Sequence, residues 1–336
     1  MTDNPTLRWA GLAVLAVGLV VLPFLLSSYH VFQATMVIDY AIVLLGLNIL
    51  VGFNGQISLG HGAFYAIGAY TTAILVSQTD IPYWATIPIA GAVCLGAGYV
   101  FGLPALRLEG LYLALATFAL AVATPQLLKY RLLEGWTGGV QGITLVKPDP
   151  PLHLPINADQ WLYFLCLVIA VPLYVIGWNL LRARTGRALV AIRDHPTAAA
   201  AMGINTAFYK TSTFGISAMF TGIGGALGAI VTQYVAPDSF PIFLSLFFMV
   251  GIVVGGVASI AGAVFGAIFI EFVPNVASEI SDAAPWAIYG VFLIGCMYVM
   301  PRGVAGLIRT LAERARQPQA ETKQAKTLSP RGERAG

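Results

Sequence analysis

Apolar runs of roughly twenty residues follow one another along most of the chain, separated by short polar or glycine-rich breaks. A run of about 17–25 mostly apolar residues is what a helix needs to cross a bilayer. The pattern therefore predicts about ten membrane-spanning helices. The expected helices cover residues 9–28, 34–52, 57–77, 84–103, 110–128, 160–180, 211–234, 242–258, 260–276 and 286–300.

The composition supports a membrane environment. Of the 336 residues, 58% are hydrophobic and only 10% are charged, and the mean hydropathy is +0.80. A soluble domain carries about 25% charged residues. The fold class expected is an all-α polytopic membrane protein. Repeated small residues in 211–230 and 253–271 predict close helix packing, because small faces let helix backbones approach in lipid.

The basic residues predict the orientation. Three of the 18 Lys and Arg residues (Lys129, Arg131 and Lys147) fall in the long 129–158 loop, and the other fifteen fall on the opposite side with both termini. Because basic loops stay inside, both termini are expected in the cytoplasm and the 129–158 loop outside. The net charge of +3 reflects this bias and does not indicate nucleic-acid binding. Residues 1–310 form the predicted transmembrane domain, and the polar 311–336 tail is expected to be disordered.

The sequence offers no sign of catalysis. It has no nucleophile–base pair and no GxxxxGK[ST] loop, so hydrolysis of ATP by this chain alone is not expected. None of the four histidines has a ligand partner at helical spacing, and the three cysteines are widely separated in apolar runs. No metal site is predicted. A membrane enzyme or scaffold stays an alternative without a supporting cluster.

The stretch GFNGQISLGHGAFYAIGAY, residues 52–70, interrupts two apolar runs with polar side chains and glycines. It predicts a broken helix, in which Asn54-Gly55 turns, Ser58 caps the next helix and the Gly60–Gly62 backbone is exposed. Freed backbone groups in membrane helices can face a cavity. A weaker echo of the stretch runs through residues 255–267 and is too short to establish a repeat.

Two ionisable residues, Asp39 and Glu271, lie inside predicted spans. An unpaired charge there costs at least ~2.5 kcal/mol, so each needs a partner, water or a proton. Either residue could line a polar path or relay protons, or could cap or pair with a neighbouring helix. The sequence leaves both readings open for Asp39 and favours the second for Glu271.

The connection RARTGRALVAIRDHPTAAAAMGINTAFYK, residues 182–210, is the largest one predicted inside the cell. One short helix is expected from Arg187 to Arg193, with Leu189 and Ile192 on one face. Pro196 then opens a second, Ala-rich helix that Gly203 ends. Two readings apply: helix-in-groove docking to a soluble partner, or an ordered connector.

These motifs resemble a known family from about residue 34 to 309. GFNGQISLGHGAFYAIGAY, GRALVAIRDHPTAAAAMGIN with the following YK and FGISA, and WTGGVQGI at 136–143 are similar to signatures of LivM-type permeases. Those permeases serve ABC importers of branched-chain amino acids, and the class includes urea and amide transporters. The resemblance implies a type II importer bundle in the bacterial inner membrane, in which 129–158 is periplasmic.

The resemblance also implies partners and roles. A LivH-type permease, two cytoplasmic ATPases that bind ATP and Mg²⁺, and a periplasmic substrate-binding protein would complete the importer, and this chain would need no cofactor. Residues 198–203 would be the coupling helix in an ATPase groove. Ala200 stands where the family often has an acidic residue, and Pro196 replaces another frequent polar site, so no charge pair is carried over. The expected coupling residues are Arg187, Arg193, Pro196, Ala198, Ala199, Ala200 and Gly203.

The substrate passage is expected at the helix break. Its candidate residues are Asn54, Gln56, Ser58 and His61, with Asp39 as a further candidate. The binding protein of such importers selects the solute, so branched-chain amino acids or similar small polar solutes are the expected class. The alternative function is an ion-coupled secondary transporter with a relay of Asp39, His61 and Glu271.

Overall fold

The computed structural model describes residues 5–79, 81–108, 110–151, 155–280 and 285–314. Within these described residues there are ten long helices, and each corresponds to one expected span. They are α1 (Pro5–Leu25), α2 (Ser28–Asn48), α3 (His61–Gln78), α4 (Tyr83–Ala105), α5 (Leu111–Leu128), α7 (Ala158–Arg182), α10 (Thr206–Thr232), α11 (Ile242–Gly255), α12 (Ile260–Ile280) and α13 (Pro285–Val299).

Eight segments of the described chain are long and apolar enough to cross a membrane, as judged by length and composition. The two long helices outside that set are α1 and α3. Helix α3 carries imidazole, hydroxyl and amide side chains, which dilute its apolar residues. The fold is thus the all-α polytopic bundle that the hydrophobic pattern predicts.

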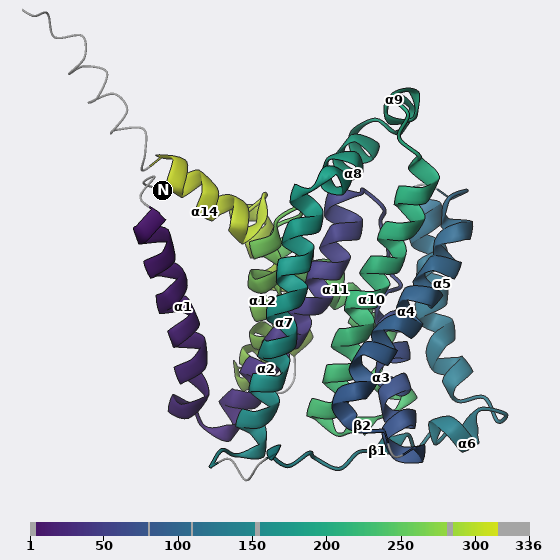
Figure 1. The fold of residues 1–336 in the computed structure, drawn as a ribbon, viewed down its shortest axis with the longest axis vertical. Coiled ribbons are helices and arrows are strands. Elements are labelled where there is room, and N and C mark those ends of the chain that lie inside the picture. The colour runs from purple at the N-terminus through teal and green to yellow at the C-terminus, as the bar shows by residue number, and fades with distance from the viewer. Residues whose placement is uncertain (1–4, 80, 109, 152–154, 281–284, 315–336) are drawn as a thin grey trace, which may run out of the picture.

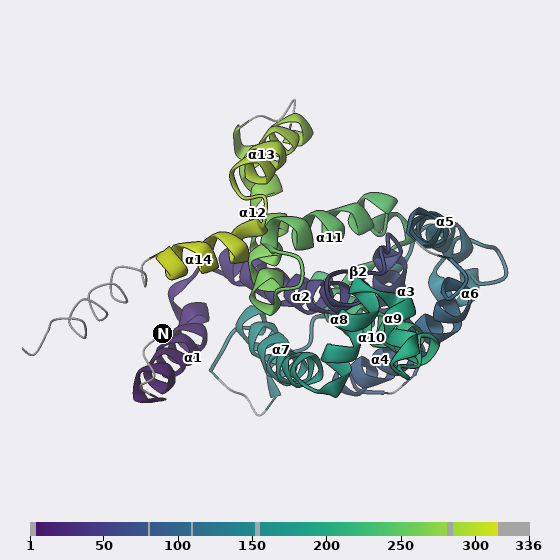
Figure 2. The ribbon, with the colours of Figure 1, turned by 90° about the horizontal axis from the view of Figure 1, so that it is seen from above.

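Helix α10 lies at the centre of the larger group of helices, against α2, α3 and α4 (Figure 2). Its glycines allow this contact. A Cβ atom at Gly225 would overlap the carbonyl of Tyr65, and one at Gly222 would overlap the Cys94 side chain. At the edge of the molecule, α13 and α1 stand apart from this group (Figure 2). The close helix packing expected from the small residues is therefore confirmed for α10.

Short elements mark the two ends of the bundle (Figure 1). Helices α8 (Arg184–Asp194), α9 (Pro196–Ala201) and α14 (Gly303–Arg314) lie at one end, called here the α9 end, where α1 also begins. The opposite α6 end holds α6 (Glu134–Thr137) and strands β1 (Ile143–Thr144) and β2 (Tyr234–Val235). The 129–158 loop and the 182–210 connection are thus at opposite ends.

The strands tie the long loop to the end of α10. β1 pairs antiparallel with β2, with Ile143 opposite Val235, and Lys129 forms an ion pair with Asp238 at 2.5 Å. A 3-10 turn (Pro237–Ser239) leads from β2 towards α11. The expected disordered tail lies outside the described residues, except that α14 continues to Arg314.

Candidate functional site

The expected helix break is present, and it occupies residues 49–60 between α2 and α3. Helix α2 passes into a π-helical turn, Ile49–Phe53, and the chain then turns at Asn54 and at Gly55, whose φ is +73°. Such turns often occur at functional sites in helices. The predicted Asn54-Gly55 turn is confirmed. Helix α3 starts at His61, four residues later than the expected start at residue 57.

Two local predictions for this break are wrong. The residue that precedes α3 as its N-cap is Gly60, and the Ser58 hydroxyl accepts the Gly60 N–H at 3.3 Å. Residues 60–62 are buried, and hydroxyls of other helices bind backbone N–H groups of this segment. Leu59 N–H donates to Thr117 Oγ1 of α5, and Gly62 N–H donates to Ser245 Oγ of α11, each at 2.9 Å.

His61 lies at the centre of a chain of buried hydrogen bonds. Its Nδ1 is 3.2 Å from Ser58 Oγ and its Nε2 is 2.7 Å from Ser217 Oγ of α10. Ser217 Oγ donates to the Gly46 carbonyl of α2 at 2.6 Å. Since Ser217 donates its proton to Gly46, its oxygen is the acceptor of the His61 Nε2–H. The imidazole therefore links α3 and α10, and Ser217 extends the link to α2.

Asn54 and Gln56 are buried differently from His61. Asn54 is 2% exposed, yet neither its Oδ1 nor its Nδ2 has a hydrogen-bond partner among the described residues. Gln56 is 6% exposed, and its Oε1 has none either. Leaving a buried polar group unpaired costs about 1–3 kcal/mol. Asn54 and Gln56 are therefore buried polar side chains whose hydrogen-bonding capacity is not fully used within the described residues.

Asp39 lies on α2, fully buried and away from the His61 hydrogen bonds. The Tyr65 hydroxyl donates to Asp39 Oδ2 at 2.8 Å, whereas Oδ1 has no partner among the described residues. Gly224 and Gly228 of α10 make room for this carboxyl group. A cavity of about 160 Å³ adjoins Tyr65 and is lined also by Tyr40, Thr232 and Ser239, among others.

The residues of the alternative relay have separate partners. Tyr65, which binds Asp39, follows His61 by four residues on α3, a rise of ~6 Å. Glu271 on α12 has its carboxyl group 3.4 Å from Asn275 Nδ2, one turn further along the same helix. The structure therefore pairs Glu271 within its own helix, whereas the sequence favours a cap or a partner on a neighbouring helix.

The 182–210 connection forms the expected two-helix unit. Leu189 and Ile192 of α8 are buried, and Gly203 follows α9 with a φ of +84°. In α9, Ala198 and Ala200 are exposed, whereas Ala199 is only 4% exposed and packs inside the chain. A bulky residue at Ala199 would therefore disturb this unit itself.

Apolar exposure beside α9 was not apparent from the sequence. Met202 is 84% exposed and Phe208 is 56% exposed. Ala198 and Ala200 of α9 are exposed as well. The sequence does place Met202 directly after the alanine run. A helix as short as α9 has too few residues for its hydrophobic pattern to show which side is exposed.

Arg193 connects this unit to the helix break. Its Nη1 donates to the Gly52 carbonyl at 2.9 Å, and its Nε donates to the neighbouring Asp194 at 3.0 Å. A Cβ atom at Gly55 would come within 2.7 Å of the Arg193 Cγ atom, so Gly55 provides the space for this side chain. Arg187 Nη1 donates to the carbonyl of Arg182, at 3.4 Å.

Asn48, the residue before the π-helical turn, binds the turn between α11 and α12. Its Nδ2 donates to Ser259 O at 2.8 Å and, more weakly, to Gly256 O at 3.4 Å. Its Oδ1 accepts the N–H of Ala258 at 2.8 Å. The only sequence signal for this role is an amide inside an apolar run.

The fold and this arrangement define a polytopic membrane protein in which the helix break between α2 and α3 is bonded to an ordered unit outside the bundle. Residues 30–301 match the family described as the branched-chain amino acid transport system permease component. The chain belongs to this family of membrane permeases.

Several curated proteins are similar to the chain. The high-affinity branched-chain amino acid transport system permease protein LivM of Escherichia coli is 32% identical, over 89% of this chain and 75% of that protein. The LivH permease of the same system in Escherichia coli is 22% identical, over 80% of this chain and 91% of that protein. The autoinducer 2 import system permease LsrC of Salmonella paratyphi B is 26% identical, over 73% and 77%. No solved structure matches the chain significantly.

Proposed function

We propose that this chain is one permease half of an ATP-driven importer for branched-chain amino acids or similarly small polar solutes. It pairs with a LivH-type permease in the bacterial inner membrane. Two ATPases, which bind ATP and Mg²⁺, dock at the α9 end, and a periplasmic binding protein delivers the solute at the α6 end. The likeness to LivM and LivH supports this assignment. The excess of basic residues at the α9 end supports cytoplasmic termini.

The observation that carries the proposal is the hydrogen bond from Arg193 to Gly52. It joins the unit that resembles a coupling helix to the broken helix beside the candidate passage. A displacement of α8 and α9 by the ATPases is passed to the Gly52 backbone and then to residues 54–61. His61 and Ser217 extend the same connection to α10 and α2.

In this mechanism the passage is lined by the Asn54 amide group and by the Oε1 atom of Gln56, which have no hydrogen-bond partner among the described residues. Closure of the ATPases moves the break and changes which side of the membrane these amides face. The solute exchanges hydrogen bonds with them and is released inwards. Asp39 and its adjoining cavity lie further along the bundle, on the side of Tyr65.

An ion-coupled secondary transporter is the second candidate. The observation that favours it is the buried Asp39 carboxyl group with one unpaired oxygen. It has less support from hydrogen bonding, because His61 bonds to Ser217 and Glu271 to Asn275, although Glu271 lies close enough to interact electrostatically with Asp39. It requires transport by this chain alone and loss of transport when the ion gradient collapses.

The docking proposal is tested by co-purification of the ATPases with Met202→Asp. A carboxylate in an apolar interface has to be desolvated, so we expect recovery of the ATPases to fall about tenfold or more. Leu132→Asp is the matched control, because Leu132 is equally exposed, at 79%, but lies in the loop at the α6 end. Equal recovery with both variants would contradict ATPase docking at α9.

A further inference from the structure

Helix α14 lies at the α9 end and directly follows α13. The segment Ala287–Leu311 is long and apolar enough to be one membrane span, but the structure divides it into α13 and α14. Only residues 300–302 connect the two helices, a reach of at most roughly 14 Å. Helix α14 then runs across this end of the bundle, from α12 towards the start of α1 (Figures 1 and 2). It therefore begins at the end of a span and does not continue the direction of that span.

Gly303 allows this change of direction. Its φ is +70°, a conformation in which a residue with a side chain would be strained. A Cβ atom at Gly303 would also come within 2.6 Å of the Gly256 Cα atom, in the turn between α11 and α12. Asn48 binds the same turn. The start of α14 is thus packed directly against the segment that Asn48 binds.

One face of α14 is apolar. Its members have the spacing of a helical stripe, and they are Val304, Leu307, Ile308 and Leu311. Val304 is half-buried against the main hydrophobic core, whereas Ile308 is 46% exposed and Leu311 is 55% exposed. The stripe therefore starts on the core and becomes exposed as the helix leaves the bundle.

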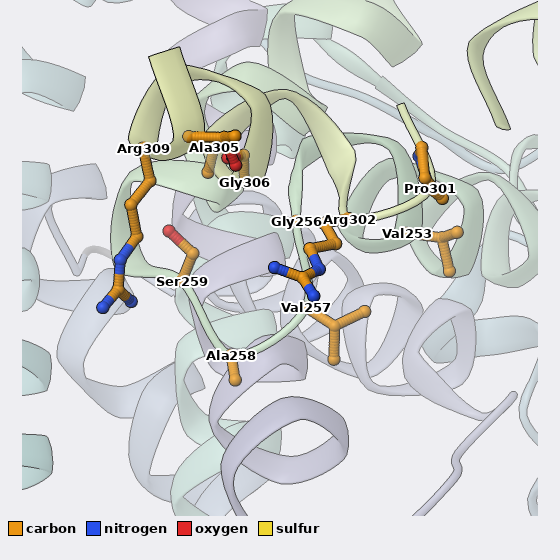
Figure 3. Close-up of a pocket in the computed structure, with 11 residues that line it drawn as sticks. Val253, Gly256, Val257, Ala258, Ser259, Pro301, Arg302, Ala305, Gly306 and Arg309 are labelled. Carbon is orange, nitrogen blue, oxygen red and sulfur yellow. The ribbon is translucent and has the colours of Figure 1, made fainter. Parts of the chain in front are cut away.

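The opposite face of α14 meets the α11–α12 turn across a cavity of about 620 Å³ (Figure 3). Ser259 lines this cavity from the turn, and the helix contributes Ala305, Gly306, Arg309 and Thr310. At about 3.6 residues per turn, these four positions are centred on the side of the helix opposite to the apolar stripe. The exposed stripe is thus turned away from the cavity and from the α11–α12 turn.

The level of α14 in the bundle points to lipid as the partner of the stripe. Helix α9 projects further out than α14 does, so a soluble protein bound at α9 lies beyond the level of α14 (Figure 1). Amphipathic helices at a membrane surface lie in its plane, with the apolar face buried at the boundary of the acyl chains and the polar face in water. This placement removes the Ile308 and Leu311 side chains from water, which is favourable.

We infer that α14 is an interfacial helix that rests on the lipid bilayer, with Leu307, Ile308 and Leu311 against the acyl chains. The bilayer then holds α14 over the α11–α12 turn, through the contact of Gly303 with Gly256. The interaction is with acyl chains, so it requires no particular headgroup. It is also independent of the transported solute and of the ATPases.

The test is quenching of a fluorescent amino acid, incorporated at one position at a time in the full-length chain, in bilayers of phosphatidylethanolamine and phosphatidylglycerol. Phospholipids that carry bromine on their acyl chains quench a fluorophore among those chains. An interfacial apolar face is buried roughly 5–10 Å, so quenching at Ile308 should be about threefold stronger than at Thr310 on the opposite face. Met202, which is 84% exposed near the tip of α9, is the control for a probe in water. Equal quenching at Ile308 and Thr310 would overturn the inference.

Two further measurements separate lipid from a protein partner. Ile308→Asp with Leu311→Asp should reduce quenching of a probe at Leu307 about threefold, because carboxylates resist transfer out of water. Thr310→Asp, on the opposite face, should not reduce it, and retained quenching in the double variant would contradict burial of the stripe. In intact cells, where every partner is present, a photo-crosslinking amino acid at Ile308 or at Leu311 should capture lipid. Capture of a second permease or of an ATPase at both positions would also overturn the inference.

Discussion

Arg193 Nη1 donates a hydrogen bond to the carbonyl oxygen of Gly52 at 2.9 Å, although the two residues are 141 positions apart. The bond joins α8 to a π-helical turn, where the regular helical pattern of hydrogen bonds is interrupted. Its position means that α8 cannot shift without either carrying the turn with it or losing this bond.

Replacing Arg193 by Gln should uncouple ATP hydrolysis from transport. Loss of a charge-assisted hydrogen bond at a partly exposed site should lower the solute moved per ATP about fivefold. Parallel measurement of uptake and phosphate release in proteoliposomes gives this ratio. Arg184→Gln is the control, because Arg184 is an exposed arginine of the same helix and is not among the expected coupling residues. If both variants keep the ratio of the unmodified importer, the proposed connection through Gly52 is wrong.

Replacement by alanine should lower folding stability at Asn48 but not at Asn54, although both asparagines are buried. Asn48 makes three hydrogen bonds to the α11–α12 turn, so Asn48→Ala should cost about 2–4 kcal/mol of folding stability. Asn54 has no hydrogen-bond partner among the described residues, so Asn54→Ala should leave the melting temperature within about 2 °C. The passage proposal requires that Asn54→Ala nevertheless lose most uptake. Full uptake by this variant would remove Asn54 from the passage.

His61→Ala should lower thermal stability, because it leaves Ser58 and Ser217 without their partner and opens a cavity between α3 and α10. Such a loss is about 2–4 kcal/mol. His30→Ala is the control: His30 is exposed and bonds to Ser27, and the effect there should be below about 1 kcal/mol. Scanning fluorimetry of both variants distinguishes the roles. An unchanged melting temperature for His61→Ala, with uptake lost, would instead make His61 a residue of the passage.

Gly225→Ala should be among the most damaging single-methyl additions in the protein. The new Cβ atom would overlap the Tyr65 backbone carbonyl, so α3 and α10 would have to separate. Overpacking of this kind costs about 1–3 kcal/mol. Gly96→Ala on α4 is the matched control, since no atom lies within 4 Å of its added methyl group. It should be neutral or stabilising by up to about 1 kcal/mol. Equal melting temperatures for both variants would contradict the described α3–α10 contact.

Asp39→Asn separates the importer from the ion-coupled alternative. The amide oxygen can still accept the Tyr65 hydroxyl, so the fold should be retained. As an importer, the assembled complex should keep ATP-driven uptake within about threefold and should be insensitive to a protonophore. Uptake by the chain alone that both the protonophore and Asp39→Asn abolish would favour the secondary transporter.

The hydrophobic pattern was sufficient to predict the ten long helices and the two-helix unit at 182–210, because helix length and Pro and Gly placement are local properties. The start of α3 was not predictable in the same way. Its first turn is set by hydroxyls at Thr117 and Ser245, which lie 58 and 183 residues from the atoms they bind. The bond between Arg193 and Gly52 and the role of Asn48 were not predictable either, because their partners are also distant in the sequence. The motif at 52–70 drew attention to the right segment, and only three-dimensional contacts separate its bonded His61 from its unpaired Asn54.

The central position of α10 has a consequence for biosynthesis. Translation delivers α2, α3 and α4 to the membrane more than a hundred residues before α10 is complete at Thr232. Until then the small-residue surfaces of these earlier helices have no final neighbour, and lipid or a membrane chaperone must cover them. A nascent chain stopped before α10 should therefore be a preferred substrate of membrane proteases, and one stopped just after Thr232 should be markedly more resistant.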